Sequence, residues 1–281
     1  MKYGELYEWA WQALTRAGIG EAKLEARLLL EFVCDTKKHD LIVHGDAEVT
    51  REQEKDFRAG IEKRLQRIPL AYITGSQEFM GLTFKVTPDV LIPRQDTETL
   101  VEEVLRYLHD GMAILDLCTG SGCILLSLLW YSNACRGVGA DISRNALQIA
   151  GENARALGLS AEWTESDLFA QIAGKFDIMV SNPPYIKRAV IETLEAEVSR
   201  QEPHLALDGG VDGLVYYKRI LEKAGHYLYH GGRLFLEIGY DQAAKVSALM
   251  QAAGFYEVIC VQDLAGKDRV IHGIYGGDAG V

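Results

Sequence analysis

The sequence has little positive charge for its size. Its 281 residues include 40 Asp and Glu against 29 Lys and Arg, which gives a formal net charge of −11. Proteins that grip nucleic acid along their whole surface need clustered Lys and Arg. The charge balance therefore argues against a direct nucleic-acid substrate, although it is compatible with a local basic patch.

Long hydrophobic runs are also missing. No stretch approaches the roughly 18 uninterrupted apolar residues of a membrane span. The first residues, 1–5, carry an early acid and no apolar core of the kind that a signal peptide needs. We therefore expect no membrane partner. We also expect a cytoplasmic protein and a monomer.

Cysteine pairs are absent as well. The five cysteines are odd in number, scattered, and include no C-x-x-C pair: Cys34, Cys118, Cys123, Cys135 and Cys260. We interpret them as reduced thiols. His226 and His230 lie four apart on a predicted helix, but no carboxylate motif accompanies them, so we expect no metal site.

The N-terminal part of the chain has the periodicity of helices. Apolar residues recur at helical spacing through residues 1–75, where Thr50 and Gln53 have the form of a capping box. Pro69 is expected to end this helical region. We predict a small all-helical domain over 1–75 that recognises the substrate.

A short linker follows this domain. Alternating residues around Gly81 predict a β-hairpin within residues 76–95. Asp96 or Thr97 is the expected N-cap of the helix that opens the next domain, residues 96–281.

Strand and helix patterns alternate from residue 112 onward. The candidate strands are 113–118, 136–141, 161–166, 176–181, 232–238, 256–262 and 269–275. The candidate helices are 122–131, 143–157, 213–229 and 241–252. This order predicts an α/β fold with a doubly wound, mostly parallel seven-stranded sheet. The last two strands leave no room for a helix between them, so we expect them to pair antiparallel.

The first strand of the sheet ends in a glycine-rich turn, residues 119–122. Small residues between a strand and a helix let the backbone approach a ligand. The turn lacks the lysine of a P-loop and the G-x-G-x-x-G pattern of a dinucleotide site. S-adenosylmethionine, which has no phosphates and carries a sulfonium cation, is compatible with the nearby acid Asp116.

Acidic residues at the next two strand ends support a cofactor site. Asp141 ends the second strand, where a carboxylate can accept both hydroxyls of a ribose. Asp167 follows the third strand, where it can accept from an adenine amino group. Three acids beside one turn favour S-adenosylmethionine as the cofactor.

The fourth strand runs into Asn182-Pro183-Pro184-Tyr185. This loop suits methylation of a planar amide or aromatic amine, whose lone pair is drawn into a π system. The side-chain oxygen of Asn182 and the carbonyl of Pro183 can each accept one N–H of such a nitrogen. The two prolines stiffen that carbonyl, and Tyr185 offers a flat face for stacking.

Together these features resemble the Rossmann-like class I S-adenosylmethionine-dependent methyltransferases. More narrowly, the chain resembles the PrmC/HemK family, which methylates the glutamine of the Gly-Gly-Gln motif in class 1 peptide release factors. The motifs that carry the resemblance span nearly the whole chain: 69–75, 91–94 with Thr97-Glu98, 116–122, 180–185 and 202–210.

The resemblance also implies roles for individual residues. Around the cofactor it places Cys118, Thr119, Gly120, Ser121, Gly122, Asp141, Leu168 and Asn182. It assigns Asn182, Pro183, Pro184 and Tyr185 to the substrate glutamine. Cys118 departs from the family's usual glycine, and we expect it to hold the turn only if its φ is negative.

Other functions share this loop chemistry. A sister branch that methylates a glutamine in a large-subunit ribosomal protein differs mainly in the N-terminal domain and the 92–94 region. An adenine-N6 methyltransferase acts on an equally poor nucleophile, the amino group of a flipped adenine. The net charge of −11 argues against this nucleic-acid function. A catalytically silent binding module would not need the intact loop and acids.

Overall fold

The structure, a computed structural model, describes residues 1–276, which divide into two compact units. The first unit contains Met1–Ser76 together with Ala196–Gln201. The second contains Gln77–Glu195 and residues 202–276. Within residues 1–276, no helix combines the length and the apolar character needed to cross a membrane.

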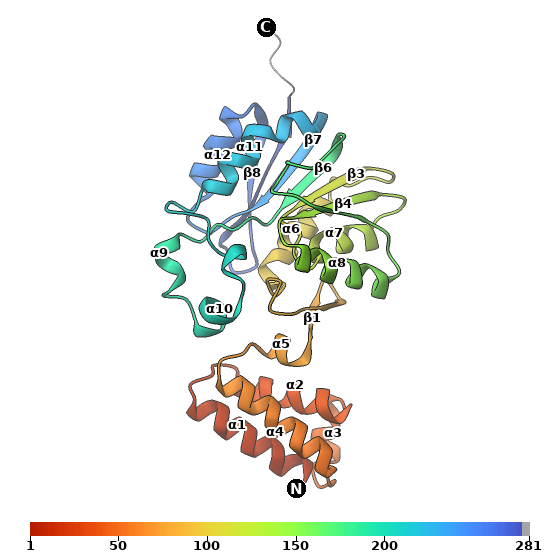
Figure 1. The fold of residues 1–281 in the computed structure, drawn as a ribbon, viewed down its shortest axis with the longest axis vertical. Coiled ribbons are helices and arrows are strands. Elements are labelled where there is room, and N and C mark those ends of the chain that lie inside the picture. The colour runs from red at the N-terminus through yellow and green to blue at the C-terminus, as the bar shows by residue number, and fades with distance from the viewer. Residues whose placement is uncertain (277–281) are drawn as a thin grey trace. The chain divides into compact units, whose positions relative to one another are not determined.

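The first unit is built from helices (Figure 1). They are α1 (Tyr3–Arg16), α2 (Ala22–Cys34), α3 (Lys38–Val43), α4 (Arg51–Leu65), α5 (Leu70–Thr74) and α10 (Ala196–Gln201). Their core buries large side chains such as Leu6, Leu30 and Phe57. Helices α2 and α4 pack closely at Gly60, where an added Cβ would lie 2.8 Å from Leu29 Cδ2.

Two local predictions for this unit have different outcomes. The capping box is confirmed: Gln53 N donates to Thr50 Oγ1 at 3.1 Å, and Thr50 N donates to Gln53 Oε1 at 2.9 Å. The prediction that Pro69 closes the helical region is wrong. Pro69 is the N-cap of α5, because a proline with its fixed φ is well suited to begin a helix.

A buried ion cluster ties α10 into the first unit. The Arg64 side chain is 6% exposed, and its Nη2 lies 3.2 Å from Glu25 Oε1 and 2.9 Å from Glu197 Oε1. Arg67 adds a contact of 3.1 Å to the same oxygen of Glu197. Sequence periodicity gave no sign that residues 196–201 join this unit.

The second unit begins with the predicted hairpin. Strands β1 (Ser76–Phe79) and β2 (Leu82–Lys85) are joined by Met80 and Gly81, both with positive φ, as a tight two-residue turn requires. Helix α6 (Gln95–Leu105) follows. The prediction that Asp96 or Thr97 caps α6 is wrong, because Arg94 is the N-cap and the Thr97 side chain is buried.

A seven-stranded sheet forms the centre of this unit, in the order β5-β4-β3-β6-β7-β9-β8. The strands are β3 (Ala113–Leu117), β4 (Arg136–Asp141), β5 (Glu162–Glu165), β6 (Phe176–Ser181), β7 (Leu228–Glu237), β8 (Phe255–Gln262) and β9 (Asp268–Tyr275). Strands β3 to β7 are parallel, and β9 lies antiparallel between β7 and β8. Both the mostly parallel sheet and its antiparallel final pair are therefore confirmed.

Helices cover both faces of the sheet (Figure 1). They are α7 (Cys123–Trp130), α8 (Arg144–Leu157), α11 (Val215–Tyr227) and α12 (Ala243–Ala252), with short turns α9 (Arg188–Ile191) and η1 (His204–Ala206). Side chains alternate along β3: Leu115 and Leu117 pack with α11 and α12, and Ile114 packs with α6 and α7. This doubly wound arrangement brings the carboxyl ends of the five parallel strands to one edge of the sheet.

Candidate active site

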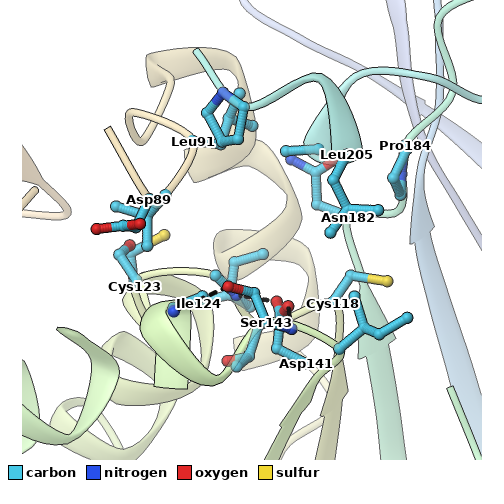
Figure 2. A pocket seen from close by; sticks show the side chains of 18 of the residues that line it. Asp89, Leu91, Cys118, Cys123, Ile124, Asp141, Ser143, Asn182, Pro184 and Leu205 are labelled. Carbon is cyan, nitrogen blue, oxygen red and sulfur yellow. Dashed lines mark hydrogen bonds between the residues drawn. The ribbon is translucent and has the colours of Figure 1, made fainter. Parts of the chain in front are cut away.

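A cleft opens at the carboxyl ends of β5, β4, β3 and β6, which are neighbours in the sheet. It has about 1020 Å³ of space open to solvent, enough for a nucleoside-sized ligand. Figure 2 shows Asn182 and Pro184 on one side of the cleft and Asp89 on the other, with Asp141 between them. The predicted strand ends therefore meet at one site.

The glycine-rich turn after β3 lines this cleft. It contributes Cys118, Thr119, Gly120 and Ser121. Gly122 has a φ of +79°, and an added Cβ there would lie 3.0 Å from the ring of Trp163. The turn therefore brings backbone to the cleft surface and leaves no room for a side chain at Gly122.

Cys118 does not have the backbone conformation expected for it. Its φ is +59°, in the left-handed region that favours glycine. Cys118 thus holds the turn with a positive φ, so the condition that its φ must be negative is wrong. Burial raises the pKa of the Cys118 thiol, so the side chain is a neutral group beside the cleft.

Asp116 supports the turn through a hydrogen bond and does not line the cleft. It is fully buried, and the Thr119 hydroxyl donates to its Oδ2 at 2.6 Å. Burial raises its pKa to about 7, with a further contribution from the charge of Asp141. Its expected place among the cofactor contacts is therefore replaced by a role in holding the turn.

Asp141 lines the cleft and binds the turn through its carboxylate. Oδ2 accepts from Gly120 N at 2.9 Å, and Oδ1 accepts from Ser143 N at 2.9 Å. Burial raises its pKa, and these backbone donors oppose that rise. A carboxylate has about four acceptor sites, so two remain for a ligand.

Asp167 and Leu168 also line the cleft, after β5. The Asp167 carboxylate is half exposed and pairs with Arg219 at 2.8 Å. Leu168 is buried with a φ of +52°, and the Ser166 hydroxyl donates to its carbonyl at 2.7 Å. The Arg219 ion pair competes with the predicted contact between Asp167 and an adenine amino group.

The Asn-Pro-Pro-Tyr loop reaches the cleft through Asn182 and Pro184. Asn182 Nδ2 donates to Thr97 Oγ1 at 3.4 Å. No hydrogen bond from another group in residues 1–276 reaches Asn182 Oδ1 or the carbonyl oxygen of Pro183. Neither predicted acceptor is thus occupied by a hydrogen bond within these residues, but only Asn182 lines the cleft, whereas Pro183 is buried and is not part of the cleft wall.

Tyr185 has a different environment from the one predicted. It does not line the cleft, and its hydroxyl donates to Glu237 Oε1 at 3.1 Å. Burial and the charge of Glu237 raise the pKa of Tyr185. The hydroxyl therefore fixes the ring of Tyr185 to Glu237. The ring face that was predicted to stack on the substrate is not part of the cleft wall.

Sequence reasoning missed the remaining walls of the cleft. Some lie in motifs of the family resemblance, 91–94 and 202–210, to which no site role was given, and the others carry no local signal for binding: Asp89, Val90, Leu91, Pro93, Cys123, Ile124, Ile142, Ser143, Ala146, Ser166, Pro203, Leu205, Ala206 and Tyr216. Arg94 and Thr97 also line it, whereas Glu98 accepts from Met80 N at 2.7 Å in the hairpin turn. Arg94 forms an ion pair with the buried Glu202 and so links two of these segments.

The structure gives no support for metal chemistry at the histidines considered above. His226 lies on α11 and His230 in β7, so the two are not on one helix as predicted. In residues 1–276, no group of three or more His, Cys, Asp or Glu side chains is arranged to hold a metal ion.

The residues of the cleft fit S-adenosylmethionine. Asp141 keeps free acceptor sites for ribose hydroxyls, and the half-exposed side chains of Ile142 and Leu205 provide apolar surface for a flat base. The turn at 118–122 presents backbone without bulky side chains. No lysine or arginine cluster is present in the turn to bind phosphates.

Known proteins resemble both units. The family described as PrmC N-terminal domain matches residues 5–75, and the Methyltransferase small domain family matches residues 95–263. The structure resembles a methyltransferase from Pyrococcus furiosus with a TM-score of 0.55 and 16% identity, covering 78% of this chain and 98% of that one. At this identity, the likeness concerns the class I methyltransferase fold.

Sequence relatives are much closer. The release factor glutamine methyltransferase of Moorella thermoacetica is 46% identical over 266 residues, which cover 92% of this chain and 94% of the relative. That of Geobacter sulfurreducens is 40% identical over 273 residues, which cover 97% and 96%. The chain therefore belongs to the release factor glutamine methyltransferase family.

Proposed function

We propose that this protein methylates the side-chain amide nitrogen, N5, of the glutamine in the Gly-Gly-Gln motif of class 1 peptide release factors. The observation that carries the proposal is Asn182, whose Oδ1 accepts no hydrogen bond within residues 1–276 and which lines a cleft that fits S-adenosylmethionine, next to the unbonded carbonyl of Pro183. A primary amide has two N–H groups, which match two acceptors. The names of the relatives agree with this chemistry.

The cofactor of this reaction is S-adenosylmethionine, which supplies an electrophilic methyl group attached to a positively charged sulfur. Asp141, the 118–122 turn and Leu168 are the residues that would hold it. Asn182 and Pro184 lie at the side of the same cleft, so the loop can present a substrate amide to it.

The protein's contribution is mainly alignment. Asn182 Oδ1 and the Pro183 carbonyl would each accept one N–H of the glutamine amide and direct its lone pair toward the methyl group. Positioning of two reactants can contribute about 7–11 kcal/mol to the lowering of a barrier. Both acceptors are neutral and would hold the nitrogen as positive charge develops on it. The S–CH₃ bond would break as the N–CH₃ bond forms, which leaves S-adenosylhomocysteine, and the nitrogen would then release a proton to solvent to give a neutral amide.

The protein is expected to act as a monomer in the cytoplasm, with the helical unit recognising the release factor. These points stay predictions. Size-exclusion chromatography with light scattering tests whether the protein is a monomer. Loss of methylation on deleting residues 1–75 tests whether the helical unit recognises the release factor, provided that the truncated protein still binds S-adenosylmethionine.

The decisive experiment is incubation with labelled S-adenosylmethionine and a purified class 1 release factor, followed by mass mapping. We expect one added methyl group on the Gly-Gly-Gln glutamine and none on a release factor with alanine at that position. Parallel reactions with ribosomal protein and with DNA test the two rival functions. Methylation of either, with none of the release factor, would overturn the proposal.

A further inference from the structure

A buried amide contacts the end of the Asn-Pro-Pro-Tyr loop. Gln242 is the N-cap of α12 and is 3% exposed, yet its side chain makes no capping hydrogen bond to that helix. The side chain instead reaches three other places in the second unit: the loop after β6, the segment 209–213 and the chain that leaves β7. Burying an amide is costly unless its N–H groups and its oxygen are bonded, so these partners determine where the side chain lies.

The partners of Gln242 fix the direction of its amide. Its Nε2 donates to the carbonyl oxygens of Tyr185 and Gly213, each at 3.1 Å. Its Oε1 accepts from the backbone N–H of Gly239 at 2.8 Å. A carbonyl can only accept and a backbone N–H can only donate. An amide turned by 180° would therefore lose all three hydrogen bonds.

Glycines allow this close approach on two sides of the amide. A Cβ at Gly213, whose φ is +73°, would lie 2.5 Å from the Tyr185 oxygen and 2.7 Å from Gln242 Nε2. A Cβ at Gly239 would lie 2.9 Å from Gln242 Oε1. The backbone can therefore reach both ends of the amide only because neither position carries a side chain.

Tyr185 carries these bonds to the site. Its carbonyl belongs to the residue after Pro184, which lines the cleft and whose ring fixes φ. Its hydroxyl donates to Glu237 Oε1 at 3.1 Å. At the other end of the loop, the Ser181 hydroxyl donates to the Leu117 carbonyl at 2.7 Å. The loop is thus held at both ends, and the two predicted substrate acceptors lie between them.

Gln242 also joins the loop to a second part of the cleft wall. Gly213 leads into α11, whose residue Tyr216 lines the cleft. Backbone hydrogen bonds support the same connection: Ile186 N donates to the Leu207 carbonyl at 3.0 Å, and Gly209 N donates to the Ile186 carbonyl at 2.9 Å. One amide therefore binds both the loop that would present the glutamine and a neighbouring wall.

We propose that Gln242 is a positioning residue for methyl transfer, which holds the main chain of Tyr185 so that Asn182 and Pro183 can align the substrate amide. This inference rests on the proposed function, because it explains how the loop is kept where the reaction needs it. Such support matters, since a misplacement of about 1 Å can cost about 100-fold in rate.

Gln242→Met tests the proposal, because methionine has a similar length but offers no N–H group to the two carbonyls. We expect kcat for release-factor methylation to fall about 10-fold to 100-fold. The Kd for S-adenosylmethionine should stay within about threefold of wild type, because Gln242 does not line the cleft. Gln251→Met, the same change at an exposed position of α12, is the matched control and should leave both values unchanged.

Two results with Gln242→Met would overturn the inference. One is a kcat equal to that of wild type. The other is a loss of cofactor affinity as large as the loss of kcat, which would mean that the variant damages the whole second unit.

Gln242→Glu separates the hydrogen bonds from the packing. Glutamate has the shape of glutamine and can still accept from Gly239 N, but it has at most one hydrogen for the carbonyls of Tyr185 and Gly213. We expect kcat to fall by about tenfold or more. Wild-type kcat in this variant would show that the shape of the side chain suffices and would contradict the proposal.

Hydrogen exchange followed by mass spectrometry needs no turnover and separates this inference from the proposed function. In Gln242→Met we expect faster exchange than in wild type for peptides that cover 185–191 and 207–215, which contain the paired N–H groups of Ile186, Arg188 and Gly209. Peptides from α7, residues 123–130, should exchange as in wild type. Unchanged exchange in the first two peptides, or faster exchange in α7 as well, would overturn the inference. A wild-type protein that methylates no release factor would overturn only the proposed function.

Discussion

Removing the Asp141 side chain is expected to weaken the binding of S-adenosylmethionine by about 2–4 kcal/mol. Its carboxylate accepts from Gly120 N and Ser143 N, each at 2.9 Å, and keeps two acceptor sites for the ribose. Hydrogen bonds to a charged group contribute about 1.5–3 kcal/mol each. Asp141→Ala also leaves two backbone N–H groups unpaired, but that cost is largely shared by the free and bound protein.

Isothermal titration calorimetry measures this effect directly. A loss of 2–4 kcal/mol corresponds to a rise in Kd of about 30-fold to 800-fold. Asp167→Ala is a useful comparison, because that carboxylate is half exposed and paired with Arg219, and its loss should cost less than about 1 kcal/mol. Binding by Asp141→Ala within about threefold of wild type, roughly 0.6 kcal/mol, would refute the reasoning.

The remaining predictions concern the loop and the first unit. Asn182→Ala should abolish turnover but retain cofactor binding by calorimetry, and full activity would mean that the loop is only structural. In Gly209→Ala, the new Cβ would lie 2.7 Å from the Tyr185 backbone. This variant should lower the free energy of unfolding in urea by about 1–3 kcal/mol and should also lower kcat. Wild-type values of both quantities would contradict this prediction. Burial opposes ionisation of Glu197, but hydrogen bonds from its own N–H, Arg64 and Arg67 outweigh it and lower its pKa. Its stabilising effect is therefore complete above the unfolded pKa of about 4.5 and disappears as pH falls through the lower folded value, so urea unfolding of Glu197→Gln should change less between pH 5 and pH 3 than that of wild type.

Much of the fold could be predicted because the βα alternation is strongly periodic. Each strand of the sheet was found, including the antiparallel pair, for which residues 256–275 leave no room for a helix. No secondary structure was predicted for residues 186–206, which hold α9, α10 and η1. These short helices carry no long apolar stripe, and residues 196–201 are held in the first unit by the buried Arg64 rather than by a local pattern.

The site was partly predictable for a similar reason. Residues at strand ends, such as Asp141 and Asn182, could be placed because parallel strands end at one edge of a sheet. The conformation of Cys118 and the environment of Tyr185 could not be predicted, because they depend on tertiary contacts between distant segments. Asp116 shows that an acid near a cofactor turn can serve the turn itself.

A crystal structure with S-adenosylhomocysteine and a release factor tests the central claim most directly. We predict that the glutamine amide nitrogen lies within hydrogen-bonding distance of both Asn182 Oδ1 and the Pro183 carbonyl, with its lone pair facing the sulfur. A glutamine held elsewhere, or an Asn182 whose NH₂ group faces it, would contradict the account.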